Sequence, residues 1–169
     1  YPNESKENAL VNYERGMLLY GLISKYKPKT ILEIGRAQGY STMCMAWALC
    51  ENKIDGKIIS VDPLSYENSI EWLIDWDGKI KTEKKSTKQI WSKYAKSDWL
   101  EKIIPLTCFS DELLEKEDLP KFDFGFIDGH HLYEAVLCDF NIFLKNSNKK
   151  FHCLFDDYID DENARMKQA

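Results

Sequence analysis

The sequence lacks the features of several large classes of protein. None of its apolar runs approaches the ~18 residues that cross a membrane, and no positively charged leader followed by an apolar stretch opens the chain. The five cysteines include no C-x-x-C pair and are odd in number, which fits reduced thiols better than a disulfide framework. The net charge of −5 argues against a phosphate backbone as the main partner, because nucleic-acid binding relies on clustered Lys and Arg. We expect a cytoplasmic protein that binds neither membranes nor nucleic acid.

What is present is typical of one globular domain. The 169 residues are 44% hydrophobic and 13% aromatic, so the chain is long enough to bury a sizeable core. No internal repeat divides it. We therefore expect a single domain over residues 1–169.

A glycine-bracketed turn follows the first apolar run, within Ile31–Thr42. Its pattern is E-x-G-x-x-x-G, carried by Glu33, Gly35 and Gly39, and differs from the G-x-G-x-x-G of dinucleotide sites. Gly35 allows a sharp backbone turn, and Gly39 allows a helix to begin close to a ligand. An acid at the strand end is a poor neighbour for a pyrophosphate. The pattern therefore favours a ligand with a cationic or hydroxyl-rich part, such as S-adenosylmethionine.

Short apolar runs alternate with helical patterns along the chain. The predicted strands begin at Thr30 and span 57–62, 103–107, 122–128 and 151–157, with helices expected over 6–26, 40–50 and 131–145. This alternation predicts an α/β fold with a doubly wound, mostly parallel sheet. Four of the strands end in acids, which would meet at the carboxyl edge, where such sheets bind ligands. Asp62, at the second strand end, is placed to accept hydrogen bonds from ribose hydroxyls.

These motifs resemble those of class I S-adenosylmethionine-dependent methyltransferases. The similarity is greatest to the small-molecule O-methyltransferases of the catechol type and the macrocin-type sugar O-methyltransferases. It covers roughly residues 8–160 and implies a Rossmann-like fold. The segments that carry it are residues 31–42, 61–62, 126–134 and 154–158.

The resemblance implies a set of cofactor contacts. We expect the methionine end of S-adenosylmethionine near the glycine turn, the ribose at Asp62 and the adenine after the third strand. The residues assigned to the cofactor are Glu33, Gly35, Gly39, Tyr40, Ser41, Asp62, Ser110, Asp111 and Asp128. Phe109 stands where relatives often have a glycine.

The resemblance also implies chemistry at the strand-end acids. Asp128, Asp156 and Asp157 match the metal-binding acids of these O-methyltransferases, and three oxygen ligands suit Mg²⁺. The alternative is a solvated acidic stretch, because further acids follow Asp157. His131 stands where catechol-type relatives have a basic lysine, and His130 where sugar-methylating relatives have an aspartate. Either histidine could be the general base or a further metal ligand, or His131 could instead cap the next helix.

Residues 63–102 form a longer connection than this fold needs. It holds four of the five tryptophans and a lysine-rich middle. Trp72 and Trp76 are one helical turn apart, so we expect an inserted helical hairpin. Its tryptophans either pack on the body, with solvated lysines, or offer aromatic rings to an acceptor beside the cofactor.

The sequence gives no strand beyond the fifth, where the family's sheet has seven. We expect a sheet truncated after the fifth strand, or one completed by another subunit in a homo-oligomer. Three functions stay open at this point. They are an Mg²⁺-assisted methyltransferase acting on a hydroxyl of a small sugar or aromatic molecule, a non-catalytic S-adenosylmethionine-binding regulatory module, and an NAD-binding oxidoreductase.

Overall fold

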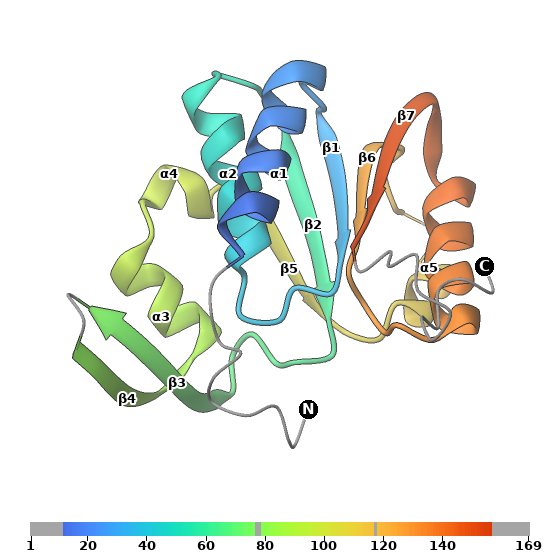
Figure 1. Ribbon diagram of the computed structural model, residues 1–169. Coiled ribbons are helices and arrows are strands. Elements are labelled where there is room, and N and C mark those ends of the chain that lie inside the picture. Colours follow the sequence, from blue (N-terminus) through green and yellow to red (C-terminus); the bar gives the residue numbers. More distant parts are fainter. Residues whose placement is uncertain (1–11, 77–78, 117, 157–169) are drawn as a thin grey trace.

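A five-stranded parallel sheet forms the centre of the molecule (Figure 1). The computed structural model describes residues 12–76, 79–116 and 118–156. The strand order is β5-β2-β1-β6-β7, and every neighbouring pair runs parallel. The strands are β1 (Thr30–Ile34), β2 (Lys57–Asp62), β5 (Ile103–Thr107), β6 (Phe122–Ile127) and β7 (Ser147–Phe155). All five predicted strands and the predicted α/β, doubly wound class are confirmed.

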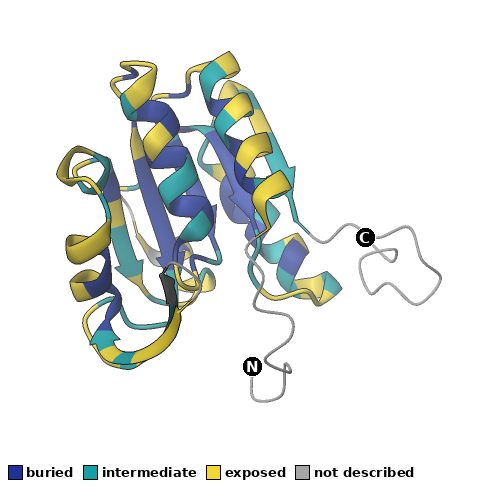
Figure 2. Cartoon of the chain, turned by 60° about the vertical axis from the view of Figure 1, so that its left-hand side comes forward, coloured by how far each residue is buried: buried dark blue, intermediate teal, exposed yellow. Residues whose placement is uncertain are grey.

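Helices cover both faces of this sheet. Helices α1 (Tyr13–Tyr26) and α2 (Tyr40–Glu51) pack on one face, and α5 (Tyr133–Lys145) with the 3-10 turn η2 (Asp111–Glu115) packs on the other. Neighbouring residues of β1 show the division, because Ile31 belongs to the α1–α2 core and Leu32 to the α5 core. Figure 2 shows the central strands of the main sheet as the most buried layer. Burial on both faces explains why β1, β2 and β6 read as continuous apolar runs, whereas the edge strands β5 and β7 are partly exposed.

The strand register places the carboxyl ends of β1, β2, β6 and β7 at one edge of the sheet. Three backbone hydrogen bonds define this edge: Gly35 N donates to Val61 O at 3.0 Å, Asp128 N to Ile34 O at 2.8 Å, and Asp156 N to Ile127 O at 3.0 Å. Since each bond joins the residue just after one strand to the end of its neighbour, the turn at Gly35 and the acids after β6 and β7 lie in one row.

The predicted helical hairpin over residues 63–102 is wrong in its first half. There the chain forms the antiparallel strands β3 (Ser69–Trp76) and β4 (Lys79–Ser86), followed by α3 (Thr87–Tyr94) and α4 (Ser97–Leu100). Ile70, Trp72 and Ile74 face the core while Glu71 and Leu73 are exposed. This alternation of period two is the signature of a strand. A four-residue spacing of tryptophans fits either element, so it could not identify a helix.

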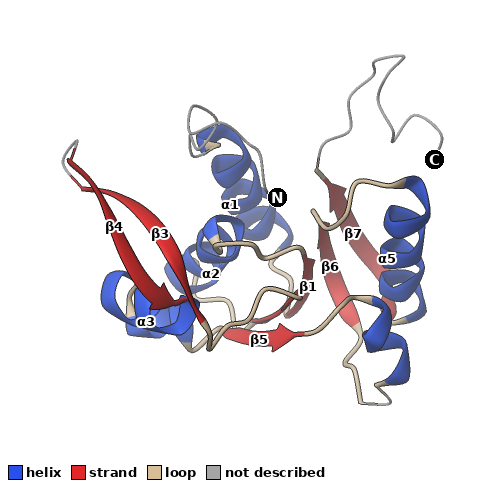
Figure 3. Ribbon diagram, turned by 90° about the horizontal axis from the view of Figure 1, so that it is seen from below, coloured by secondary structure: helices blue, strands red, loops and turns tan. Residues whose placement is uncertain are grey.

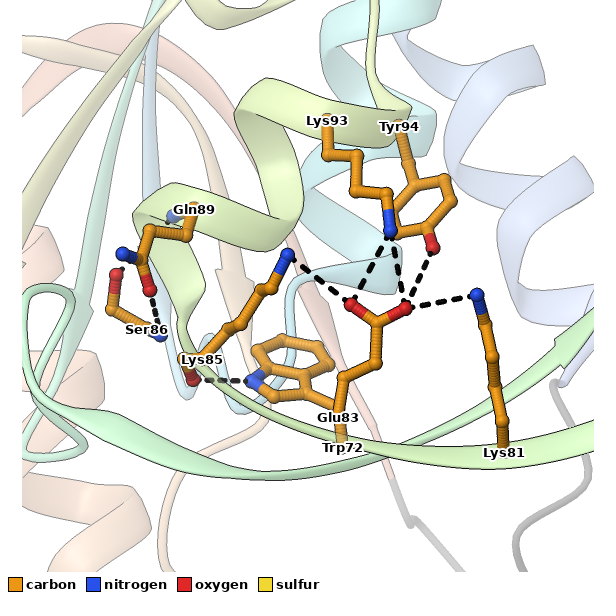
Figure 4. A network of polar contacts seen from close by, with 8 residues as sticks. All are labelled: Trp72, Lys81, Glu83, Lys85, Ser86, Gln89, Lys93 and Tyr94. Carbon is orange, nitrogen blue, oxygen red and sulfur yellow. Dashed lines mark hydrogen bonds and ion pairs between the residues drawn. The ribbon is translucent and has the colours of Figure 1, made fainter.

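The β3–β4 hairpin lies against α3, apart from the main sheet (Figure 3). A glutamate of the hairpin neutralises part of the positive charge of its lysines. Glu83 pairs with Lys81, Lys85 and Lys93, and these partners lower the pKa of Glu83 to about 2 (Figure 4). Trp72 is buried and its indole N–H donates to the Lys85 carbonyl at 2.9 Å. Trp72 therefore packs on the body, as one of the two sequence interpretations expected.

Candidate functional site

The glycine turn after β1 begins the site. Gly35 and Gly39 both have φ of +92°, a conformation that side chains with a Cβ rarely adopt. A Cβ on Gly35 would lie 1.9 Å from the Asp128 carbonyl oxygen, and one on Gly39 would lie 2.1 Å from the Trp91 ring. The close approach expected at Gly39 is therefore to an indole of the inserted segment, in addition to any ligand that the turn faces.

The inserted segment supports this turn directly. Trp91, on α3, is buried, and its indole N–H donates to the Gln38 carbonyl at 3.1 Å. Tyr66 meets the Trp91 ring edge-on with centroids 5.4 Å apart. Trp91 thus holds the backbone of the turn from behind, a role that tryptophan content alone could not indicate.

Two cavities adjoin at the carboxyl edge and share Gly35, Ala37 and Asp128. The first, about 270 Å³, lies over the ends of β1, β2 and β6 and includes Asp62, Ser110, His130 and Asp139 in its lining. The second, about 290 Å³, lies at the start of α2 and includes Arg15, Gly39, Tyr40 and Ser41. The structure thus brings most of the predicted cofactor residues to two adjoining cavities.

Asp62 is held in place by the backbone around it. Its Oδ2 accepts from Ala37 N at 2.7 Å, and its Oδ1 accepts from Leu64 N at 2.6 Å. The carboxylate therefore joins the glycine turn to the segment after β2. Each oxygen has a second lone pair, so both can accept a further hydrogen bond from a ligand in the first cavity.

Glu33 does not reach either cavity. It is fully buried, and its Oε2 accepts from Thr42 Oγ1 at 2.6 Å and from Ser60 Oγ at 2.5 Å. Burial raises the pKa of this carboxyl to about 7. Its position ties β1, β2 and α2 together behind the turn. The expected direct contact with the cofactor is thus replaced by a supporting role.

The acids after β6 and β7 converge on a guanidinium that the sequence analysis did not consider. Arg15 Nη1, from the first turn of α1, donates to Asp128 Oδ2 at 3.0 Å and also to Asp156 Oδ2. All three side chains are largely buried, with exposed fractions of 26% for Arg15, 17% for Asp128 and 21% for Asp156. Asp157, the third predicted metal ligand, lies outside the described residues.

The residues expected to hold Mg²⁺ fit that ion in part. Two carboxylate oxygens lie within reach of one point, and oxygen is the donor that Mg²⁺ prefers. Within the described ranges, no group of three or more His, Cys, Asp or Glu side chains is arranged to hold a metal. The geometry therefore provides two ligands, with Arg15 at the point where they meet.

The two histidines lie on the loop after β6 in different surroundings. His131 is half-exposed, and its Nε2 lies 3.8 Å from Asp128 Oδ1. His130 lines the first cavity, and its Nδ1 accepts from Leu132 N at 3.2 Å. Helix α5 begins only at Tyr133, with Leu132 as its N-cap residue, so His131 does not cap it.

The region after β5 holds one predicted residue and one that was missed. Ser110 lines the first cavity, whereas Asp111 lies on the exposed side of η2 and outside the lining. Asp139, on α5, is almost fully buried at the cavity wall. Burial raises the pKa of Asp139, against the opposing effect of a hydrogen bond with Ser110. Its place midway along an amphipathic helix gave no signal, although a lone acid on the apolar face could have been noticed.

Arg36 is a third residue of the site that the sequence did not indicate. Its guanidinium is buried and donates to three carbonyl oxygens, those of Ser60 at 2.9 Å, Leu64 at 2.8 Å and Leu106 at 3.2 Å. The side chain thus joins the ends of β2 and β5 beneath the glycine turn. Since it occupies a variable position of E-x-G-x-x-x-G, the motif gave no indication of this role.

Residues 32–158 match a family model described as a methyltransferase domain. The chain belongs to this methyltransferase family, and its resemblance to the class I methyltransferases is confirmed. It is also similar to an uncharacterized protein of Acanthamoeba polyphaga mimivirus, with 32% identity over 132 residues. That match covers 78% of this chain and 52% of the viral protein.

Solved structures share the fold at low identity. The O-methyltransferase TomG from Streptomyces achromogenes, crystallised with S-adenosylmethionine, has a TM-score of 0.61 and 21% identity over 94% of this chain and 65% of its own. A Bacillus cereus O-methyltransferase with bound S-adenosylhomocysteine has a TM-score of 0.61 and 20% identity, covering 95% and 67%. Podospora anserina methyltransferase PaMTH1 has a TM-score of 0.61 and 16% identity, covering 87% of this chain and 53% of its own.

The chain therefore spans about half the length of the curated relative it matches and about half to two thirds of these structures. No helix of the described part is long and apolar enough to cross a membrane.

Proposed function

We propose that this protein binds S-adenosylmethionine and transfers its methyl group to a hydroxyl of a small molecule, a sugar or an aromatic compound, with the assistance of Mg²⁺. One observation carries the proposal. Two cavities at the carboxyl edge join at Gly35 and Asp128, with the Asp62 carboxylate in one and the start of α2 in the other. An elongated cofactor with a ribose and an amino-acid end suits such a paired hollow.

The residues divide the binding task by chemistry. Asp62 can accept hydrogen bonds from ribose hydroxyls, and Ser110 and Asp139 are further polar residues in the lining of the first cavity. Gly39, Tyr40 and Ser41 line the second cavity at the first turn of α2, where backbone N–H groups favour an anionic group such as a carboxylate. The methionine end of the cofactor belongs there.

The proposed reaction is an in-line displacement. An acceptor oxygen forms a bond to the methyl carbon while the bond from sulfur to that carbon breaks, which leaves S-adenosylhomocysteine. The hydroxyl proton passes to a base, for which His131 is suited because it is accessible and adjacent to Asp128. Asp128 and Asp156 would hold Mg²⁺, which lowers the pKa of a hydroxyl bound to it. In this reaction the described residues position the acceptor and take its proton, because the acceptor oxygen is itself the nucleophile.

A calorimetric titration tests the proposal. S-adenosylmethionine, S-adenosylhomocysteine and NAD⁺ are titrated in turn into the purified protein, with Mg²⁺ or with EDTA. We expect micromolar binding of the two sulfur compounds, and a loss of roughly tenfold or more in Asp62→Ala, because hydrogen bonds to a charged group are worth about 1.5–3 kcal/mol. Asp55→Ala, which removes an exposed carboxylate before β2, is the matched control and should bind like the wild type.

The same titration has two contrary outcomes. Binding of NAD⁺ alone would replace the methyltransferase proposal with an oxidoreductase. No binding of any of the three compounds to a folded protein would reject cofactor binding altogether. Folding of each variant is checked by circular dichroism, because Asp62 also holds Ala37 and Leu64 in place.

A second candidate function is a regulatory module that binds S-adenosylmethionine without turnover. The observation that favours it is the pairing of Arg15 with both described carboxylates of the expected metal site. Such a module predicts cofactor binding that Mg²⁺ does not alter and no methyl transfer to any hydroxylated acceptor. A screen with radiolabelled methyl donor, with and without Mg²⁺, separates it from the enzyme.

A further inference from the structure

The guanidinium of Arg15 joins three elements at the carboxyl edge of the sheet. Asn12 caps α1, and its Oδ1 accepts from Arg15 N at 2.8 Å, which fixes the start of the helix. From there the Arg15 side chain reaches the residues directly after β6 and β7. The arginine is thus anchored at its backbone and at its head group.

One nitrogen atom serves both acids. Nη1 of Arg15 donates to Oδ2 of Asp128 and to Oδ2 of Asp156, so two carboxylate oxygens from adjacent strands converge on a single point. Two anions this close repel each other unless a cation lies between them. Their low exposure reduces screening by solvent, and this strengthens both the repulsion and the attraction to Arg15.

A divalent cation and this guanidinium would need the same point. An ion bound to both Oδ2 atoms at about 2.1 Å would occupy the space of Nη1, which lies at hydrogen-bond distance from Asp128. The two positive charges would also repel each other strongly in a partly buried site. Simultaneous occupation of this position is therefore excluded on both steric and electrostatic grounds.

We propose that Arg15 is an internal competitor for the metal: it neutralises Asp128 and Asp156 in the cation-free protein, and a divalent cation binds there only by displacing it. The significance of this competition for methyl transfer rests on the function proposed above. In the cofactor-free protein a displaced Arg15 side chain can turn into the second cavity, which it already lines beside Tyr40 and Ser41.

A metal titration tests the competition without any turnover. Mn²⁺ is added to the protein, and the free ion is measured by electron paramagnetic resonance. Arg15→Gln should bind Mn²⁺ roughly tenfold or more tightly than the wild type, because the ion no longer displaces a charged partner worth a comparable free energy. Asp128→Asn in the Arg15→Gln background should abolish that gain. Lys25→Gln, an exposed charge removed from the last turn of α1, controls for net charge and should leave the affinity unchanged.

Other results would overturn the proposal. They are an affinity of Arg15→Gln for Mn²⁺ equal to or weaker than that of the wild type, a gain that persists without Asp128, or no Mn²⁺ binding by either protein. If Arg15→Gln does not fold, Arg15→Met is used, since it keeps an apolar stem over the same surface. Calorimetry with S-adenosylhomocysteine on the same samples distinguishes failure of the competition from failure of the proposed function. Retained binding without a change in Mn²⁺ affinity rejects only the competition, whereas absent binding in the wild type rejects the proposed function.

Discussion

Glu33 shows how a residue in a ligand-binding motif can act through the fold. Its carboxyl lies behind the glycine turn, where Thr42 and Ser60 donate to a single oxygen. The other oxygen, Oε1, is buried and has no hydrogen-bond partner within the described residues. Such a group is more easily accommodated as a neutral acid than as a carboxylate. Glu33 therefore links the proton concentration to the stability of the sheet.

We predict a pH dependence of stability that Glu33→Gln removes. The folded-state pKa of Glu33 is about 7 and the unfolded-state value is 4.5. A raised pKa means that the stabilising contribution is complete below pH 4.5 and is lost as the pH rises through about 7. The stability of Glu33→Gln relative to the wild type should thus rise over this interval by about 3 kcal/mol and stay constant above it.

Urea unfolding of both proteins at pH 5 and pH 8 measures this difference. The comparison between the two proteins cancels the contributions of all other titrating groups. A difference that is equal at the two pH values would show that Glu33 is already ionised throughout.

Among the elements, the inserted segment 63–102 supports the rest of the fold more than its sequence indicated. Its helix α3 supplies Trp91, which supports the glycine turn, while its hairpin buries Trp72. The segment therefore packs against and stabilises the wall of the proposed cofactor cavity. Two substitutions test this at the turn and at the hairpin.

Gly39→Ala should destabilise the protein by about 1–3 kcal/mol or more. The reason is twofold: a positive φ is costly for alanine, and the new Cβ would lie 2.1 Å from the Trp91 ring. Gly21→Ala on α1 is the matched control, since no atom lies within 4 Å of its added Cβ, and it should stabilise the helix by up to about 1 kcal/mol. Chemical denaturation measures both. Equal effects at the two positions would contradict the packing of Trp91 on the turn.

Trp72→Ala and Leu73→Ala test the alternation of strand β3. Trp72 is buried and Leu73 is 54% exposed, although the two are neighbours in the sequence. Loss of the buried indole should cost about 3–5 kcal/mol, whereas loss of the exposed leucine should change the free energy of unfolding by no more than about 0.5 kcal/mol. Thermal and urea unfolding report both values. Comparable costs would contradict the observed faces of the hairpin.

At the scale of the whole molecule, the main sheet could be predicted from the sequence and the inserted segment could not. Strands β1, β2 and β6 are buried on both faces and leave continuous apolar runs. All five strands were recognisable, and four of the five predicted runs end in acids. In the hairpin, core-facing and exposed residues alternate along β3. The four-residue spacing of Trp72 and Trp76 suggested a helix instead and obscured this alternation. The sequence also predicted β7 from residue 151, whereas it begins at Ser147, because Ser147 pairs with Phe122 across the sheet.

The candidate site could be predicted only where backbone position determines it. Gly35, Asp62 and Asp128 follow strand ends, and the parallel register places them together. Arg15, Arg36 and Asp139 act through the direction and length of their side chains across distant segments, which no local pattern records. The predicted cofactor contact of Glu33 differs for the converse reason. Its strand position is as expected, but its side chain is buried in the interior.

The contact between Arg15 and Asp156 spans 141 positions of the sequence. It joins the first described helix to the end of the last described strand, so the two ends of the described chain are tied together at the edge that holds the candidate site. The lining of the first cavity runs from Ile34 to Asp139, so the proposed cofactor hollow needs β6 and α5 as well as the glycine turn.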